Sequence, residues 1–240
     1  MMKNKYVYLI FIVLVFSWVA PAQNVSQFFD EADALFAKYV NNGRVNYQAI
    51  KSDPELLDQA LRTAASLQVS ISDPATYQAF WINAYNLATI KGVVENYPLK
   101  SPLDVKGFFD KKTYTLAGES LTLNAIENDK LRAEFDEPRF HFVLVCAARS
   151  CPPIINKAYR PDRLEQQLQS QTVKALNDNQ FLRVDGNSVQ FSQIMEWYKE
   201  DFTRNGRTLI QFTNQYRKSR LPLKASTGFY PYNWRLNDSK

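Results

Sequence analysis

The residues of this chain that could carry out covalent chemistry lie within one short stretch. His141 is the only histidine and Cys146 and Cys151 are the only cysteines among 240 residues. Cysteine hydrolases pair a thiol with an imidazole, which takes the thiol proton so that the thiolate can attack an acyl carbon. Any such chemistry must therefore start in residues 139–152, RFHFVLVCAARSCP.

The first half of this stretch has the pattern of a buried β-strand. Residues 140–145 are almost all aromatic or β-branched and are too apolar on both faces for a surface strand, so we predict a central strand. The second half breaks into a polar loop, because Pro152 and Pro153 oppose regular structure. Loops at the ends of buried strands commonly present side chains to a ligand.

The spacing leaves three states open for the two cysteines. In an extended chain His141 and Cys146 would lie roughly 16 Å apart on opposite faces, so a dyad needs a turn at Cys146. Either Cys146 begins a helix whose N-terminus lowers the pKa of the thiol, or the loop returns Cys151 towards His141. The three states are a Cys146–Cys151 disulfide in an oxidising compartment, a reactive thiol, and two inert buried thiols.

Several function classes are excluded by the composition. One histidine rules out the two-histidine zinc protease motif, and a zinc site built on His141 and the two cysteines lacks a ligand unless a carboxylate joins. The chain has no phosphate-binding glycine loop, no dinucleotide fingerprint and no Gly-x-Ser-x-Gly elbow, so we expect no metal and no cofactor. The formal net charge is only +5 and the basic residues are scattered, which argues against a nucleic-acid partner.

The N-terminal segment has the features of a secretory signal peptide. Lys3 and Lys5 precede an apolar run over residues 6–19, and the small residues 20–22 allow cleavage before Gln23. The run is shorter than the ~20 residues that span a bilayer, so an uncleaved anchor is the less favoured alternative. We therefore predict a signal peptide over residues 1–22, a periplasmic or secreted mature protein, and no stable membrane span after cleavage.

The mature chain, residues 23–240, is predicted to form a single domain. It has few glycines, no internal repeat and no Ser/Gly-rich linker. Helical spacing of apolar residues predicts helices over residues 25–40, 53–67 and 72–97, a helix after Pro161, and shorter ones near 193–201 and 207–216. Hairpins are predicted over residues 114–123 and 181–191. This order favours an α+β fold, with helices packed around a small, mostly antiparallel central sheet.

Two asparagines interrupt the apolar helix predicted over residues 72–97. Asn83 and Asn86 lie three positions apart and share a face. A buried amide without a partner costs about 1–3 kcal/mol, so both must be hydrogen-bonded. Either they hold neighbouring backbone, or they orient a catalytic side chain or bind a substrate amide.

Five motifs in order resemble the domain-of-unknown-function family 547 (DUF547). They are residues 80–86 (FWINAYN), 123–127 (LNAIE), 139–142 (RFHF), 146–153 (CAARSCPP) and 232–237 (YNWRLN). The likeness extends over residues 71–236. It implies an α+β protein of the kind found in secreted bacterial chains, distantly similar to papain-like or transglutaminase-like thiol enzymes.

The resemblance also implies roles for individual residues. Cys146 would be the nucleophile, His141 the imidazole and Glu127 an acid that orients it. Asn83 and Asn86 would support the site or bind substrate.

Arg149 in the cysteine loop is a further candidate for substrate binding. The sequence departs from the family pattern at Asn128, where histidine is frequent, and at Asn233, where aspartate is usual. If the histidine were the family's catalytic base, this chain would be impaired.

Two functions from different classes remain open, and with them the question whether the chain is an enzyme. The first is a thiol hydrolase or acyltransferase acting on a peptide-like amide or a cell-envelope substrate, with backbone N–H groups near Ala147 stabilising the oxyanion. The second is a non-catalytic periplasmic interaction module whose loop is closed by a Cys146–Cys151 disulfide. The sequence identifies no specific substrate or partner.

Overall fold

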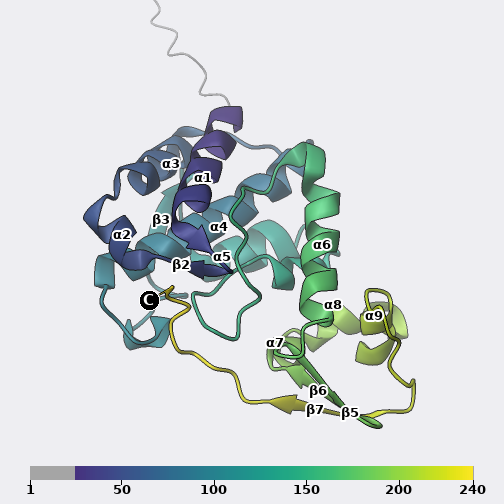
Figure 1. Ribbon diagram of the computed structural model, residues 1–240. Coiled ribbons are helices and arrows are strands. Elements are labelled where there is room, and N and C mark those ends of the chain that lie inside the picture. Colours follow the sequence, from purple (N-terminus) through teal and green to yellow (C-terminus); the bar gives the residue numbers. More distant parts are fainter. Residues whose placement is uncertain (1–24, 240) are drawn as a thin grey trace, which may run out of the picture.

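The structure is a computed structural model that describes residues 25–239, and the predicted signal peptide lies outside the described residues. Helices and small sheets alternate along the chain, which confirms the α+β class (Figure 1). The α-helices are α1 (Val25–Tyr39), α2 (Tyr47–Ser52), α3 (Glu55–Ser66), α4 (Pro74–Asn96), α5 (Leu123–Ala125), α6 (Leu164–Leu176), α7 (Ile194–Trp197), α8 (Lys199–Thr203) and α9 (Leu209–Asn214). Helix α5 continues into the π-helical segment η2 (Ile126–Arg132), and short 3₁₀ turns are η1 (Pro102–Asp104), η3 (Pro138–Phe142), η4 (Pro161–Arg163) and η5 (Arg204–Gly206).

Helix α4 lies at the centre of the molecule, as its apolar sequence predicts. It begins where Asp73 accepts a hydrogen bond from the Thr76 backbone N–H at 3.2 Å and Pro74 takes the first turn. Helices α1, α2 and α3 pack against it (Figure 1). Because it is covered on all sides, Phe80 and Trp81 are almost completely buried.

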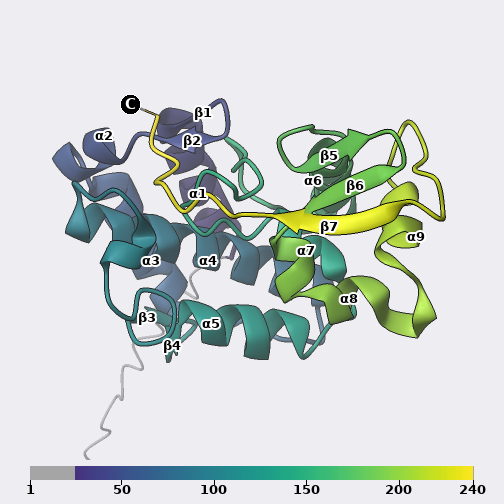
Figure 2. The same cartoon turned by 90° about the horizontal axis from the view of Figure 1, so that it is seen from below.

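The strands form three small sheets within the described part of the chain. Strands β1 (Val40–Asn41) and β2 (Arg44–Val45) pair antiparallel, as do β3 (Thr113–Leu116) and β4 (Glu119–Thr122). The third sheet has the order β5 (Leu182–Asp185), β6 (Ser188–Ser192), β7 (Ser226–Tyr230); β5–β6 is antiparallel and β6–β7 parallel. Both predicted hairpins are confirmed. The three-stranded sheet lies at one end of the molecule, away from α1–α3 (Figure 2).

The central strand predicted over residues 140–145 is wrong. Residues Pro138–Phe142 form η3, and residues 143–145 have no regular structure. The burial was predicted correctly, since Phe140 and Phe142 are completely buried. The chain turns because Pro138 begins a 3₁₀ turn, with Glu137 accepting a hydrogen bond from the Arg139 N–H.

The C-terminal tail connects the sheet end of the molecule to its helical end. After β7 the chain crosses to α2 and β2 (Figures 1 and 2), where Asp238 forms a parallel bridge with Val45. The Tyr47 hydroxyl donates a 2.6 Å hydrogen bond to Asn237 Oδ1, and both residues are buried. The tail is therefore part of the packed structure, and it passes directly over the cysteine loop.

Candidate functional site

Cys146 and Cys151 form a disulfide, with their Cα atoms 6.2 Å apart. Of the three states left open by the sequence, the structure therefore contains the bridged one. The loop turns at Ala147, whose φ of +60° lies in the left-handed region that non-glycine residues seldom adopt. Of the two alternatives for the turn at Cys146, the one in which Cys146 begins a helix is not observed.

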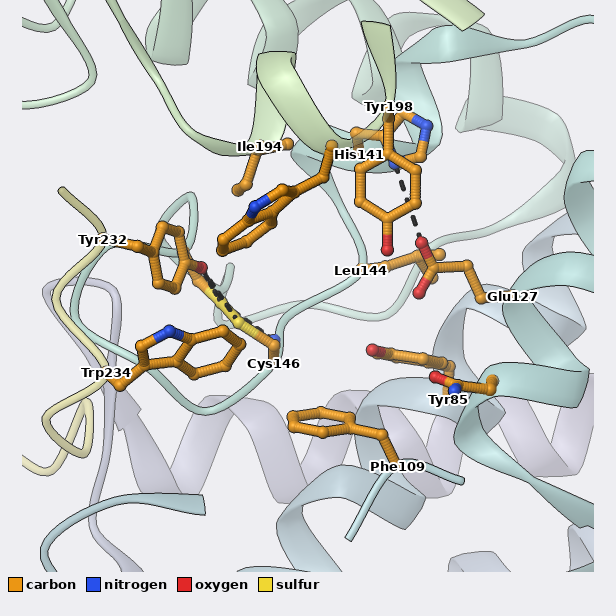
Figure 3. A pocket seen from close by; sticks show the side chains of 13 residues that line it. Tyr85, Phe109, Glu127, His141, Leu144, Cys146, Ile194, Tyr198, Tyr232 and Trp234 are labelled. Carbon is orange, nitrogen blue, oxygen red and sulfur yellow. Dashed lines mark hydrogen bonds and ion pairs between the residues drawn. A yellow bond between two sulfur atoms is a disulfide. The ribbon is translucent and has the colours of Figure 1, made fainter. Parts of the chain in front are cut away.

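Tyr232 from the tail lies against both sulfur atoms. Its hydroxyl is 3.0 Å from Cys146 Sγ and 3.1 Å from Cys151 Sγ (Figure 3). Burial raises the pKa of this hydroxyl well above its usual value, so it remains a neutral donor. The Arg149 N–H also donates to the Arg235 carbonyl at 2.8 Å, and the Asn237 N–H donates to the Ala147 carbonyl at 2.9 Å. The terminal motif, residues 232–237, therefore holds the cysteine loop in place.

Asn86 holds the chain just before the cysteine loop. Its Oδ1 accepts from the Val145 N–H at 2.9 Å and its Nδ2 donates to the Val143 carbonyl at 3.0 Å. Asn83 forms the same pair of bonds with the N–H and carbonyl of Tyr159, at 3.0 and 2.8 Å. Both side chains therefore hold backbone, as the first of their two predicted roles requires. A direct part in substrate binding stays a prediction.

His141 lies between two carboxylates. Its Nε2 is 2.8 Å from Asp201 Oδ2, and its Nδ1 is 3.7 Å from Glu127 Oε1. The ring is buried and stacks on Tyr198 with centroids 3.9 Å apart. Both ring nitrogens are thus directed to acids.

Asp201 on α8 is strongly compensated by positive charge. Besides His141, Arg132 Nε lies 2.7 Å from its Oδ2 and Arg204 Nη2 lies 3.0 Å from its Oδ1. Burial alone would raise the pKa of Asp201, but the hydrogen bonds and charges of His141 and Arg132 outweigh it and hold the pKa well below its usual value. Asp201 is therefore an ionised, structurally satisfied group.

Glu127 on η2 is buried but faces a pocket. Its carboxylate and the hydroxyl ends of Tyr85 and Tyr198 point into the same space (Figure 3). Burial raises the pKa of Tyr198, and the charge of Glu127 and a hydrogen bond to it raise that pKa further. The hydroxyl is therefore a neutral donor beside the carboxylate.

The pocket has a volume of about 290 Å³ and a mainly aromatic wall. It brings together Glu127, His141 and Cys146, three of the predicted site residues. Asn83 and Asn86 are not among the residues that line it, and Arg149 is exposed beside a neighbouring polar cavity. The aromatic side chains of the wall are Tyr85, Phe109, Trp197, Tyr198, Tyr232 and Trp234.

Comparison with known families agrees with four of the five sequence motifs, and the fifth, residues 232–237, lies outside the match. The model of the family described as "Protein of unknown function, DUF547" matches residues 70–176. No curated protein and no solved structure matches the chain.

The matched segment contributes only part of the pocket. It supplies Glu127, His141 and both cysteines, whereas Tyr232 of the terminal motif lies outside the matched residues. Asn128, the position of the frequent family histidine, accepts a hydrogen bond from Arg132 Nη1 through its Oδ1 at 2.5 Å. It does not line the pocket.

Sequence reasoning missed Asp201, Trp197 and Tyr198. Asp201 lies 60 residues from its partner His141 and appears in the sequence as an ordinary helical acid. The one available sequence signal was the adjacent aromatic pair Trp197–Tyr198 at the end of α7, and in the structure Trp197 is 47% exposed. An exposed tryptophan beside a cavity is a frequent feature of binding sites.

The arrangement is better suited to binding than to nucleophilic attack. A disulfide sulfur is not a thiolate, and the His141 nitrogens face Glu127 and Asp201. Within residues 25–239 no cluster of three or more His, Cys, Asp or Glu side chains could hold a metal ion. None of the helices in that range has the length and apolarity needed to cross a bilayer.

Proposed function

We propose that this protein is a non-catalytic binding module that holds a small ligand in the aromatic pocket beside the Cys146–Cys151 disulfide. The observation that carries the proposal is the pocket itself, about 290 Å³ in volume, with a polar end at Glu127 and aromatic rings around the rest. Ligand sites are typically concave, mostly apolar and provided with a few placed polar groups. A cavity of this volume can hold one compact chemical group of a ligand.

The rigidity of the wall supports this proposal. Asn86 holds residues 143–145, the disulfide closes the next six residues, 146–151, and Tyr232 of the tail covers this loop. A site whose groups are held before the ligand arrives loses less conformational entropy on binding. Such preorganisation benefits a binding module.

We also propose that the protein acts in the periplasm or outside the cell. A short disulfide is stable in an oxidising compartment, and the N-terminal residues 1–22 have the composition of a signal peptide.

The test combines oxidation state with ligand binding. Intact mass of the unreduced, denatured mature protein treated with an alkylating reagent is expected to show no adduct, and two adducts after reduction. The oxidised protein is then screened by thermal shift with four compact probes: choline, phenol, benzoate and 3,3-dimethylbutan-1-ol. At least one probe should raise the melting temperature.

Trp197→Ala should abolish that rise, because the ring lines the pocket. Leu103→Ala is the matched control, since Leu103 is a large exposed apolar residue (53% exposed) that does not line the pocket. It should respond like the unchanged protein. No response to any probe, or an undiminished response in Trp197→Ala, would refute the binding module.

A second candidate is a thiol hydrolase or acyltransferase that works only after reduction. Cys146 lines the same pocket as His141 and Glu127, and this proximity supports the second candidate. An external dithiol would reduce the disulfide and become oxidised. The freed Cys146 thiol would attack an acyl carbon as its thiolate, its proton would pass to the leaving group, and water or an acceptor amine or alcohol would then cleave the thioester and restore the thiol. Cys151→Ala should then hydrolyse a p-nitrophenyl ester without reductant, and Cys146→Ala should not. Equal rates for the two variants would exclude this candidate.

A further inference from the structure

The pocket wall contains three mutually packed aromatic rings. Trp234 lies 4.7 Å from Tyr232 and 5.8 Å from Trp197, and Trp197 lies 4.9 Å from Tyr232, measured between ring centroids. Trp234 and Tyr232 come from the tail, while Trp197 is at the end of α7. Aromatic faces carry partial negative charge, so a group of such rings attracts a cation at its faces.

Glu127 places a carboxylate at the polar end of the same pocket. Among residues 25–239 its one ion-pair contact is with His141 Nδ1, at 3.7 Å. No lysine or arginine within that range lies within 4 Å of it to form an ion pair. Its other polar neighbour is the Tyr198 hydroxyl, a neutral donor, so a cationic ligand would add a charge attraction that this buried carboxylate receives from no lysine or arginine of that range at ion-pair distance.

The two nearby arginines already form ion pairs with other acids. Arg132 is bound to Asp201 and lies over the Tyr198 ring, with its Cζ 4.9 Å from the ring centroid. Arg204 is bound to Asp201 and Asp136. Asp201 is therefore satisfied, whereas Glu127 has no guanidinium at ion-pair distance and interacts with Arg132 only over a longer range.

We infer that the pocket binds a small free organic cation, with its charged head next to Glu127 and its apolar groups against Trp197, Tyr232 and Trp234. This inference rests on the proposed binding function and names its ligand class. A trimethylammonium group fits the chemistry best. It carries charge without N–H donors, and aromatic rings replace its weak hydration at little cost. An anion would be repelled by Glu127, and a neutral ligand would lack the charge–charge attraction to it.

The decisive comparison is between choline and 3,3-dimethylbutan-1-ol, in which carbon replaces the charged nitrogen and the shape is kept. Isothermal titration calorimetry on the oxidised mature protein is expected to show at least tenfold tighter binding of choline, which corresponds to about 1.4 kcal/mol. Glu127→Gln should remove this preference while keeping the pocket shape. Trp197→Ala should weaken choline at least tenfold, and Leu103→Ala should leave it unchanged.

Each outcome separates this inference from the proposed function. If both compounds bind equally, or only phenol or benzoate binds, the cation inference is refuted and the binding module stands. If no probe binds, both are refuted. If Glu127→Gln does not fold, the comparison of the two isosteres on the unchanged protein still decides. Co-sedimentation with phosphatidylcholine vesicles in the absence of free-choline binding would overturn the assignment to a free cation.

Discussion

Replacing Asn86 by alanine removes both hydrogen bonds that hold the chain just before Cys146. The Val145 N–H and the Val143 carbonyl would then lose their partner inside the core, where water does not replace it. Each orphaned group costs about 1–3 kcal/mol. Alanine is a better helix former than asparagine by about 0.5 kcal/mol, which offsets a small part. We therefore expect a loss of roughly 2–5 kcal/mol in the free energy of unfolding.

Asn96→Ala is the matched control on the same helix. The Asn96 side chain donates one hydrogen bond to the Gly92 carbonyl of its own helix turn and is exposed. Its replacement should change the free energy of unfolding by no more than about 0.5 kcal/mol. Both variants carry the same chemical change, so their difference isolates the effect of holding the loop.

Urea unfolding in buffer without reductant, followed by circular dichroism, measures both variants. The slope m should be unchanged, so that the midpoint reports stability. The loop should also become more accessible, and dithiothreitol should reduce the disulfide faster in Asn86→Ala than in Asn96→Ala. A loss below about 1 kcal/mol for Asn86→Ala, or equal effects in the two variants, would refute the role assigned to Asn86.

Three further predictions concern other parts of the structure. Replacing both Cys146 and Cys151 by alanine should lower the free energy of unfolding by about 2 kcal/mol, the loop-closure value for so short a loop, in urea titrations without reductant; an unchanged midpoint would contradict it. Because the folded pKa of Asp201 lies below the value of about 3.9 in the unfolded chain, its contribution is complete above that value and is lost as the pH falls. Melting temperatures should therefore fall below about pH 4 more steeply for the unchanged protein than for Asp201→Asn, and parallel curves would exclude this role. Gly92→Ala should lose about 1–3 kcal/mol by overpacking, since the added Cβ would lie 2.5 Å from Tyr114 Oη, and an equally stable variant in the same titration would contradict this.

The elements whose signals are local were predictable from the sequence. Asp73 and Pro74 mark the start of α4, and Asp185-Gly186 marks the β5–β6 turn, where Gly186 has a φ of +53°. Capping and turn chemistry involve residues only a few positions apart. These signals can therefore be recognised in the sequence without knowledge of the rest of the fold.

The false strand over residues 140–145 shows where local signals end. An apolar run of this length has the same composition whether a neighbouring strand or a side chain satisfies its backbone. Here the partner is Asn86, which lies 59 residues before Val145. Only the folded chain shows that an amide takes the place of a neighbouring strand.

The candidate site was predictable in its residue types and not in its geometry. His141, Cys146 and Glu127 do share a pocket, but His141 is held by Asp201, and the cysteines are bridged. The aromatic wall is assembled from α7 and the tail, separated by some thirty residues of chain. Long-range assembly of this kind leaves no periodic pattern in the sequence.

The most direct test of the binding pocket is a ¹H–¹⁵N correlation spectrum of the oxidised protein during titration with choline. The indole N–H signals of Trp197 and Trp234 are predicted to shift in a saturable manner, because both rings line the pocket. The signal of Trp81, buried in the core, serves as an internal reference and should stay in place. Saturable shifts of the two pocket signals alone would support the account. Absence of any shift, or equal movement of all three signals, would contradict it.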